Sequence, residues 1–184
     1  MTGSAVRQQF MRRFRSLSLN PRSMSVAIVT LYLAQVGAAI TLGYWLLQSP
    51  LTVLTGLGVA VVMLFIGTRL RGINNIVHEC SHFSFSERRE DNVRFGNICA
   101  SLLLNSFRSY RDDHMSHHAH LGDYERDVEL QQIKSLRLED PLTPKTVLRH
   151  VVTPFLGRHL PYYLSVDLSA RDGVVFSWLK MGLI

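Results

Sequence analysis

The chain has 184 residues, of which 47% are hydrophobic and 18% are charged, and a formal net charge of +6 at neutral pH. That length suits one ordinary domain. The positive charge comes mainly from arginines beside two long apolar stretches and therefore indicates membrane topology, whereas nucleic acid binding would require a basic face on a soluble domain, so no nucleic acid partner is expected.

Residues 1–24 form a basic arm. The arm contains no aspartate or glutamate, and its five arginines are Arg7, Arg12, Arg13, Arg15 and Arg22. Positive charges beside a membrane span stay on the cytoplasmic side, so we expect the arm to lie there. Contact with anionic lipid and a role as an organelle transit peptide are open alternatives for the same composition.

Residues 25–68 are predicted to form a transmembrane helical hairpin. No charged residue or histidine occurs from Ser23 to Thr68, and the sequence QSP at 48–50 divides this window. The two segments, 25–47 and 51–68, are each long enough to cross a hydrocarbon core roughly 30 Å thick. Two buried helices of a soluble protein are the alternative, but such helices would show a polar outer face, and the window has only scattered polar residues.

Residues 69–172 are expected to form a cytoplasmic and interfacial region, because Arg69 and Arg71 directly follow the second span. This region begins with the stretch HECSH, which places His78 and His82 on one face of a helix. The pattern H-E-x-x-H is a zinc signature in which the glutamate acts as general base. The looser pattern H-x3-H is compatible with iron, so both interpretations are open at this point.

Cys80 and Cys99 are the only cysteines in the chain. Both lie on the predicted cytoplasmic side, where a disulfide is not expected. Cys80 stands between the two histidines, but on a helix it would point about 200° away from His78. We therefore expect Cys80 to pack against neighbouring side chains and not to bind a metal.

A second group of histidines follows a predicted helix over residues 91–107, which is apolar in its middle but too short to span a membrane. Four of the eight histidines in the chain fall within seven residues, namely His114, His117, His118 and His120. At spacings of i, i+3 and i+4, the first three share one helical face. His120 points elsewhere, so we expect it to support a ligand or to lie on the surface.

The two groups together offer five imidazoles, more than one tetrahedral zinc ion can use. The excess predicts two metal ions, and imidazole ligands with positions open to dioxygen suit non-haem iron. A membrane-embedded zinc protease would need only HECSH and one further ligand, and would leave the second group unexplained. A non-catalytic membrane fragment that binds no metal is the other alternative.

The stretches NIVHECSH and HMSHH, the second beginning 32 residues after His82, resemble the first two histidine boxes of the membrane fatty acid desaturase and hydroxylase superfamily. These boxes have the patterns H-x3-H and H-x2-H-H, and the similarity covers about residues 25–130. The resemblance implies an all-α integral membrane protein with an N-terminal transmembrane hairpin and a cytoplasmic, histidine-rich helical region. The iron ligands that it implies are His78, His82, His114, His117 and His118.

Three further residues have supporting roles in this interpretation. Glu79 would accept a hydrogen bond from an imidazole N–H, and His120 would lie just outside the ligand set. Asp127 resembles the acidic position that often follows the second box, although this chain has DVE where many relatives have DPD.

The resemblance also implies the chemistry, an oxygen-dependent oxidation of an acyl chain. Its cofactors would be two non-haem iron ions, with dioxygen as co-substrate, and its substrate would be an acyl lipid, an acyl-CoA or an acyl carrier. Two electrons would come from a donor such as ferredoxin or a b-type cytochrome with its reductase. Desaturation is the first expectation and hydroxylation the alternative, since both start from the same hydrogen abstraction.

The third box of the superfamily, a second H-x2-H-H, does not occur after His120. Residues 173–184 predict the start of a further membrane span that stops at Ile184. We therefore expect the chain to be an N-terminal portion that cannot oxidise a substrate by itself.

Overall fold

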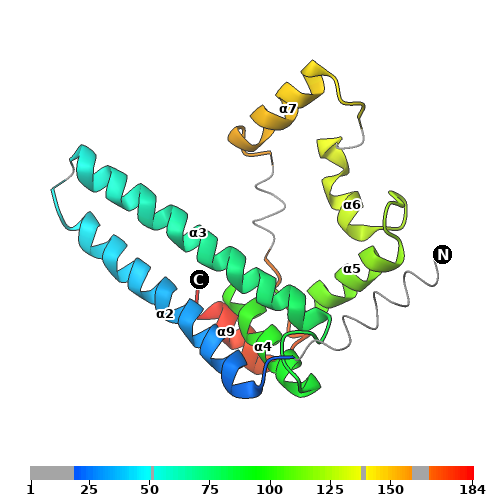
Figure 1. Cartoon of the computed structure of the whole chain (residues 1–184), viewed down its shortest axis with the longest axis horizontal. Coiled ribbons are helices and arrows are strands. Elements are labelled where there is room, and N and C mark those ends of the chain that lie inside the picture. Colours follow the sequence, from blue (N-terminus) through cyan, green and yellow to red (C-terminus); the bar gives the residue numbers. More distant parts are fainter. Residues whose placement is uncertain (1–18, 51, 138–139, 159–165) are drawn as a thin grey trace, which may run out of the picture. The chain divides into compact units, whose positions relative to one another are not determined.

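A computed structural model describes residues 19–50, 52–137, 140–158 and 166–184. The described residues are helical or irregular, apart from one isolated bridge between Asn20 and Ser86, so the expected all-α class is confirmed for them. The chain divides into two compact units, Met1–Gly96 and Asn97–Ile184, and each is described separately (Figure 1). Most of the basic arm predicted at residues 1–24 lies outside the described residues.

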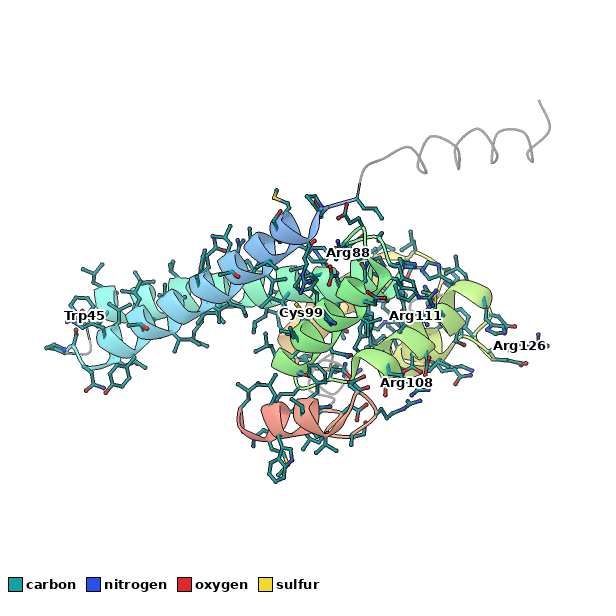
Figure 2. The ribbon with its side chains drawn as sticks, turned by 90° about the horizontal axis from the view of Figure 1, so that it is seen from below. Trp45, Arg88, Cys99, Arg108, Arg111 and Arg126 are labelled. Atoms are coloured by element: carbon teal, nitrogen blue, oxygen red, sulfur yellow. The ribbon has the colours of Figure 1, made fainter. Side chains whose placement is uncertain are left out.

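The first unit is built on two long helices, α2 (Arg22–Leu47) and α3 (Val53–Ser81), which lie side by side and antiparallel (Figure 1). Both are long and apolar enough to cross a membrane, with mean hydropathies of 1.8 and 2.0 over their most apolar windows. Trp45 lies at the loop end of α2 (Figure 2). The described part of the two predicted spans falls inside these helices, apart from Thr52, which precedes α3 as its N-cap.

Small residues allow α2 and α3 to approach each other closely. A Cβ atom on Gly43 would lie 3.3 Å from a methyl group of Val62, and one on Gly72 would overlap the ring of Tyr32. Most other apolar side chains of the two helices are exposed, including Leu31 and Leu64. A pair of helices that packs through a narrow seam and exposes leucines elsewhere is suited to a hydrocarbon environment.

α3 continues well beyond the predicted second span. It runs without a break from Val53 through Arg69 and Arg71 to Ser81, so the first histidine box occupies its last turn. Thr52 begins the helix by accepting a hydrogen bond from the backbone N–H of Thr55. The helix therefore joins the apolar segment to the first box as one element.

The helix predicted at residues 91–107 is shorter than expected. α4 covers Arg89–Leu102, and the chain then turns before α5 (Phe107–Ala119) begins. Leu104 adopts a left-handed conformation with φ of 56°, and the backbone N–H of Asn105 donates to the carbonyl of Ala100. This turn ends α4 and gives α5 a separate start, which the apolar run of leucines did not indicate.

The second unit carries the other helices of the described residues. These are α5, α6 (Val128–Ile133), the 3₁₀ turn η1 (Lys134–Leu136), α7 (Pro144–Phe155) and α9 (Val174–Met181). α9 lies within the stretch predicted to open a further membrane span, which stays a prediction. The buried Lys180 of α9 donates to the carbonyls of Asp167 and Ser169, at 2.6 and 3.0 Å.

Candidate metal centre

The first histidine box lies at the C-terminal end of α3. His78 is in the last turn and His82 is the C-cap, so the spacing of four residues places both imidazoles on the same side of the helix. Their ring centroids are 4.8 Å apart at an interplanar angle of 66°. Cys80 is fully buried, in agreement with the expected packing role. The side chains of the box therefore divide into an imidazole pair and an inward-facing thiol.

Glu79 supports the first box from within it. Its carboxylate lies 3.3 Å from Nδ1 of His78 and accepts a 2.6 Å hydrogen bond from Oγ of Ser84. The hydrogen bond from Ser84 is the main cause that lowers the pKa of Glu79, followed among the favourable causes by His78. An ionised Glu79 can only accept hydrogen bonds, so it favours the proton of His78 on Nδ1 and leaves Nε2 for a metal.

The loop after the first box is held by the buried amide of Asn92 on α4. Its Oδ1 accepts the backbone N–H groups of Phe85 and Ser86, at 3.0 and 3.1 Å, and its Nδ2 donates to the carbonyl of Ser86 at 2.7 Å. Phe83 within this loop adopts a φ of 56°. A fully hydrogen-bonded buried amide fixes a loop firmly. The C-terminal end of α3 therefore has a defined exit path.

The second histidine box occupies α5, which Ser106 caps by accepting the N–H of Ser109 at 3.1 Å. His114, His117 and His118 lie on neighbouring positions of one face, as their spacing predicted, with ring centroids 4.6 to 6.1 Å apart. The two Nε2 atoms of His114 and His118 are 3.1 Å apart. These nitrogens thus converge on one point beside the helix.

Two carboxylates on the far side of these rings set their tautomers. Oδ2 of Asp127 lies 2.7 Å from Nδ1 of His117, and Oε1 of Glu129 lies 3.0 Å from Nδ1 of His114. An ionised carboxylate has no proton to give, so each imidazole donates from Nδ1 and keeps a lone pair on Nε2. This is the usual arrangement of a carboxylate behind a metal-binding histidine.

Asp127 has a second role as the N-cap of α6. Its Oδ1 accepts the backbone N–H of Leu130 at 3.1 Å, and the side chain is fully buried. Burial works to raise the pKa of Asp127, but the hydrogen bonds from His117 and Leu130 outweigh it and hold that pKa below its ordinary value. Asp127 is therefore a charged anchor that fixes α6 and the ring of His117 together.

His120 is engaged differently from the other histidines of its group. It is the C-cap of α5, and its Nδ1 donates to the carbonyl of Ser116 at 3.0 Å. Its side chain therefore closes the end of the helix. This position agrees with the expectation that His120 points away from the face of α5 that carries His114, His117 and His118.

The start of α5 is braced by residues far along the chain. Asp172 accepts the backbone N–H groups of Phe107 and Arg108, both at 2.9 Å. Asp167 accepts from Oγ of Ser109 at 2.8 Å, and Arg171 donates to the same hydroxyl at 2.9 Å. Carboxylates at a helix N-terminus satisfy free N–H groups and favour the helix dipole. The orientation of the second box thus depends on the segment before α9.

The chemistry and geometry of the second box fit a metal ion. Two ligand nitrogens that each lie roughly 2.1 Å from one ion are about 3.0 Å apart at an N–metal–N angle of about 90° and about 3.4 Å apart at the tetrahedral angle. The observed Nε2 separation is 3.1 Å. The first box offers a second pair at helical spacing. The first box belongs to one compact unit and the second to the other.

Sequence patterns missed Glu129 and the aspartates that brace α5. Asp127 is the N-cap of the short helix α6, and Glu129 is the second residue of that helix. Two carboxylates at the start of a helix are a detectable signal for a pair of hydrogen-bond acceptors. Asp172 contacts residues 64 and 65 positions earlier, and no local pattern indicates such a contact. Asp127 was expected from the resemblance alone, and its hydrogen bond to His117 gives it a physical position.

Comparison with known proteins gives the chain a family context. The model of the fatty acid desaturase family matches residues 54–181, a segment that includes both histidine boxes. No solved structure matches the chain significantly.

Several curated plant proteins are similar to the chain. A bifunctional desaturase/conjugase of Vernicia fordii is 32% identical over 158 residues, covering 82% of the chain and 39% of that relative. An endoplasmic reticulum omega-6 fatty acid desaturase of Glycine max is 32% identical over 85% of the chain and 39% of its own length. An oleoyl-12-hydroxylase of Ricinus communis is 36% identical over 68% of the chain and 32% of its own length. The chain thus spans about two fifths or less of these relatives.

Proposed function

The chain belongs to the fatty acid desaturase family, and we propose that it carries the first two histidine boxes of a membrane-bound, non-haem di-iron desaturase. The observation that supports this most is the second box, where two Nε2 atoms converge at 3.1 Å and two carboxylates hold the opposite nitrogens. Such an arrangement prepares imidazoles as ligands before any metal binds.

The proposed ligands are five imidazoles. His78, His82, His114 and His118 each offer one ring nitrogen to a metal, and His117 presents Nε2 because Asp127 occupies its Nδ1. When bound, a pair of iron ions would supply the chemistry that uses dioxygen and two electrons to remove hydrogen from an acyl chain. Glu79, Asp127 and Glu129 would orient the imidazoles and hold their Nδ1 protons.

We favour iron over zinc because a single zinc site would leave most histidines of the second box, and the carboxylates behind them, without a role. A zinc protease would employ Glu79 as a base and would require only one ligand beyond HECSH. In the structure Glu79 accepts hydrogen bonds from Ser84 and His78. A glutamate engaged in this way serves better as a support for His78 than as a base for a water molecule.

Hydroxylation is the second candidate function. The oleoyl-12-hydroxylase of Ricinus communis is 36% identical to the chain, a slightly higher identity than that of the two desaturases described above. Both reactions begin with removal of a hydrogen atom from the acyl chain. Desaturation then removes a second hydrogen atom, whereas hydroxylation adds an oxygen atom. We place desaturation first because most of the similar proteins named are desaturases.

The proposed substrate is an acyl lipid, an acyl-CoA or an acyl carrier, presented at the membrane surface. α2 and α3 would cross the bilayer and leave the end of α3, with the first box, on the cytoplasmic face, because Arg22, Arg69 and Arg71 flank the two apolar segments. A soluble or membrane-bound donor on that face, such as ferredoxin or a b-type cytochrome with its reductase, would supply the electrons.

The direct test is the metal content of the purified chain after anaerobic addition of ferrous iron. We expect iron to bind, and we expect His82→Ala and His117→Ala each to reduce the bound iron sharply by removing a ligand. His150→Ala is the matched control, because His150 lies on α7 outside both boxes, and it should leave the iron content unchanged.

The zinc alternative gives the opposite pattern. A chain that bound one zinc ion, lost it on His82→Ala and retained it on His117→Ala would contradict the di-iron proposal. In the full-length enzyme, mass spectrometry of the acyl product would distinguish the two candidate reactions, because desaturation removes two hydrogens and hydroxylation adds one oxygen.

A further inference from the structure

The helix α7 exposes its apolar face and buries residues of its polar face, the reverse of a surface helix in a soluble protein. Its sequence, PKTVLRHVVTPF, separates apolar and polar residues onto different faces at helical spacing. A surface helix of a soluble protein buries the apolar face. In α7 the polar face is the one that contacts the preceding loop, residues 137–141.

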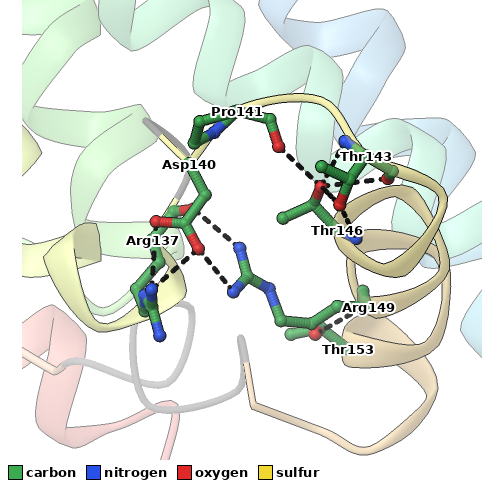
Figure 3. Close-up of polar contacts among 7 residues, drawn as sticks. All are labelled: Arg137, Asp140, Pro141, Thr143, Thr146, Arg149 and Thr153. Carbon is green, nitrogen blue, oxygen red and sulfur yellow. Dashed lines mark hydrogen bonds and ion pairs between the residues drawn. The ribbon is translucent and has the colours of Figure 1, made fainter.

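The polar face is anchored by hydrogen bonds to the preceding loop (Figure 3). Arg149 donates to Oδ2 of Asp140 at 2.8 Å and to the carbonyl of Arg137 at 2.9 Å. Thr146, which is buried, donates to the carbonyl of Pro141 at 2.7 Å. Thr153, also buried, donates within the helix to the carbonyl of Arg149 at 2.6 Å. The contacts of Arg149 and Thr146 with residues 137–141 fix which side of the helix faces the preceding loop.

The apolar face is exposed along its whole length. Two rows of residues four apart form it, and their exposed fractions are large, with Val147 at 48%, Leu148 at 63%, Val151 at 57%, Val152 at 39% and Phe155 at 88%. A helix of 12 residues is about 18 Å long and cannot cross a hydrocarbon core. This geometry suits a helix that lies in the plane of a membrane surface.

The charged residues around α7 favour contact of the helix with lipid headgroups. Lys145 and Arg158 are exposed cations at its two ends, and the helix contains no acidic residue. The carboxylate of Asp140 is already paired with Arg137 and Arg149. Cations beside an apolar strip fit the phosphates and the upper acyl chains of a lipid monolayer.

We propose that α7 is an interfacial helix whose apolar face, formed by Val147, Leu148, Val151, Val152 and Phe155, inserts into the surface of the lipid bilayer. The helix would add a membrane contact to the unit that carries the second histidine box. This inference rests on the proposed function only for the presence of a membrane, and it does not depend on the metal.

Quenching of tryptophan fluorescence by brominated lipid tests this placement in the full chain. The native tryptophans, Trp45 and Trp178, are replaced by phenylalanine, and Phe155→Trp supplies the only reporter. The protein is reconstituted in vesicles of phosphatidylcholine and phosphatidylglycerol, with or without bromine near the top of the acyl chains. We expect the brominated lipid to remove most of the Phe155→Trp emission.

Two matched proteins serve as controls. His150→Trp in the same background lies on the polar side of α7 and should lose much less emission. A protein that keeps only the native Trp45, on α2, reports whether the hairpin has inserted. Quenching of Trp45 without quenching of Phe155→Trp would overturn the inference about α7 and leave the membrane setting intact. Absence of both would contradict the membrane setting itself.

The emission maximum identifies any other occupant of the apolar face. Red-shifted emission that soluble iodide quenches would place Phe155→Trp in water, and blue-shifted emission that neither iodide nor brominated lipid quenches would place it against protein, such as a second copy of the chain. Either result overturns the proposal. Val151→Trp repeats the measurement at a second position, so that a folding defect of one variant does not decide the outcome.

Discussion

Asp127 lies fully buried behind His117, with its Oδ2 atom 2.7 Å from Nδ1 of that imidazole. The same carboxylate begins α6 through its bond to the N–H of Leu130. One buried charge therefore determines both the orientation of a proposed ligand and the position of the next helix. Replacement of Asp127 should therefore lower the affinity for the metal more than it lowers the stability of the fold.

We predict that Asp127→Asn weakens iron binding by roughly 10- to 100-fold, the usual effect of losing a carboxylate behind a metal-binding histidine. Titration of the purified chain with ferrous iron measures this change. Glu125→Gln is the control, because Glu125 is exposed in the preceding loop, and it should bind iron as the unchanged chain does. Equal affinities for the two variants would show that Asp127 does not position His117.

Asp172→Asn should loosen the start of α5. The substitution removes a negative charge at a helix N-terminus and replaces one of the two oxygens that accept the backbone N–H groups of Phe107 and Arg108 by an amide nitrogen, which cannot accept. Loss of the charge alone costs about 0.3–1 kcal/mol. Hydrogen exchange at these two amides should accelerate. Asp112→Asn breaks only an exposed pair with Arg171 and should leave both amides protected. Unchanged exchange in Asp172→Asn would refute the bracing role.

The loop before α7 should respond to acid through Asp140. The hydrogen bond from Arg149, with the positive charge of Arg137, holds the pKa of Asp140 below its ordinary value. A carboxylate with a lowered pKa in the folded state stabilises the fold at pH values above its unfolded pKa, and this contribution is lost as the pH falls through the folded pKa.

We therefore expect the contact between Asp140 and Arg149 to open below about pH 4, close to and below the ordinary aspartate pKa. Hydrogen exchange of residues 143–153, corrected for the intrinsic effect of pH on exchange, should be constant from about pH 6 to about pH 4 and should show this opening below about pH 4. Arg149→Gln should reduce the pH dependence, and Arg137→Gln combined with Arg149→Gln, which removes both partners of Asp140, should abolish it. A response that persisted in the double variant would have to come from another group.

The proposed topology can be tested by labelling cysteines in sealed vesicles or cells. Burial raises the pKa of Cys99 to about 12, and Cys80 is also buried, so both native thiols should be silent toward a charged maleimide. Ser49→Cys, in the loop between α2 and α3, should react from the outside, and Arg88→Cys should react only after the membrane is opened. The reverse pattern would place the first box on the opposite face.

The sequence was sufficient for the features that depend on local spacing. The two apolar runs indicated α2 and α3, and intervals of three and four residues indicated which faces of α3 and α5 carry the histidines. The predicted end of α4, at residue 107, was wrong because the chain turns at Leu104, which adopts a left-handed conformation that its residue type does not favour.

The residues that support the second box could not be predicted in the same way. Glu129 reaches His114 across the turn between two helices, and Asp172 reaches Phe107 from a segment 65 residues away. Such contacts depend on how the chain folds back on itself. The neighbouring acidic residues Asp127 and Glu129 indicate a pair of acceptors but not the imidazoles that they contact, and no neighbouring residue indicates the partners of Asp172. Burial of a charged side chain such as Asp127 is likewise a property of tertiary structure.

The continuity of α3 fixes the height of the first box above the apolar segment. His78 comes nine positions after Arg69, and in one continuous helix this sets a separation of about 13.5 Å along the axis. One residue inserted between them would raise the box by about 1.5 Å and turn it by about 100°. The length of helix between Arg69 and the first box is therefore fixed, and under the proposed function this residue count would set the depth in the bilayer from which an acyl tail could reach His78 and His82.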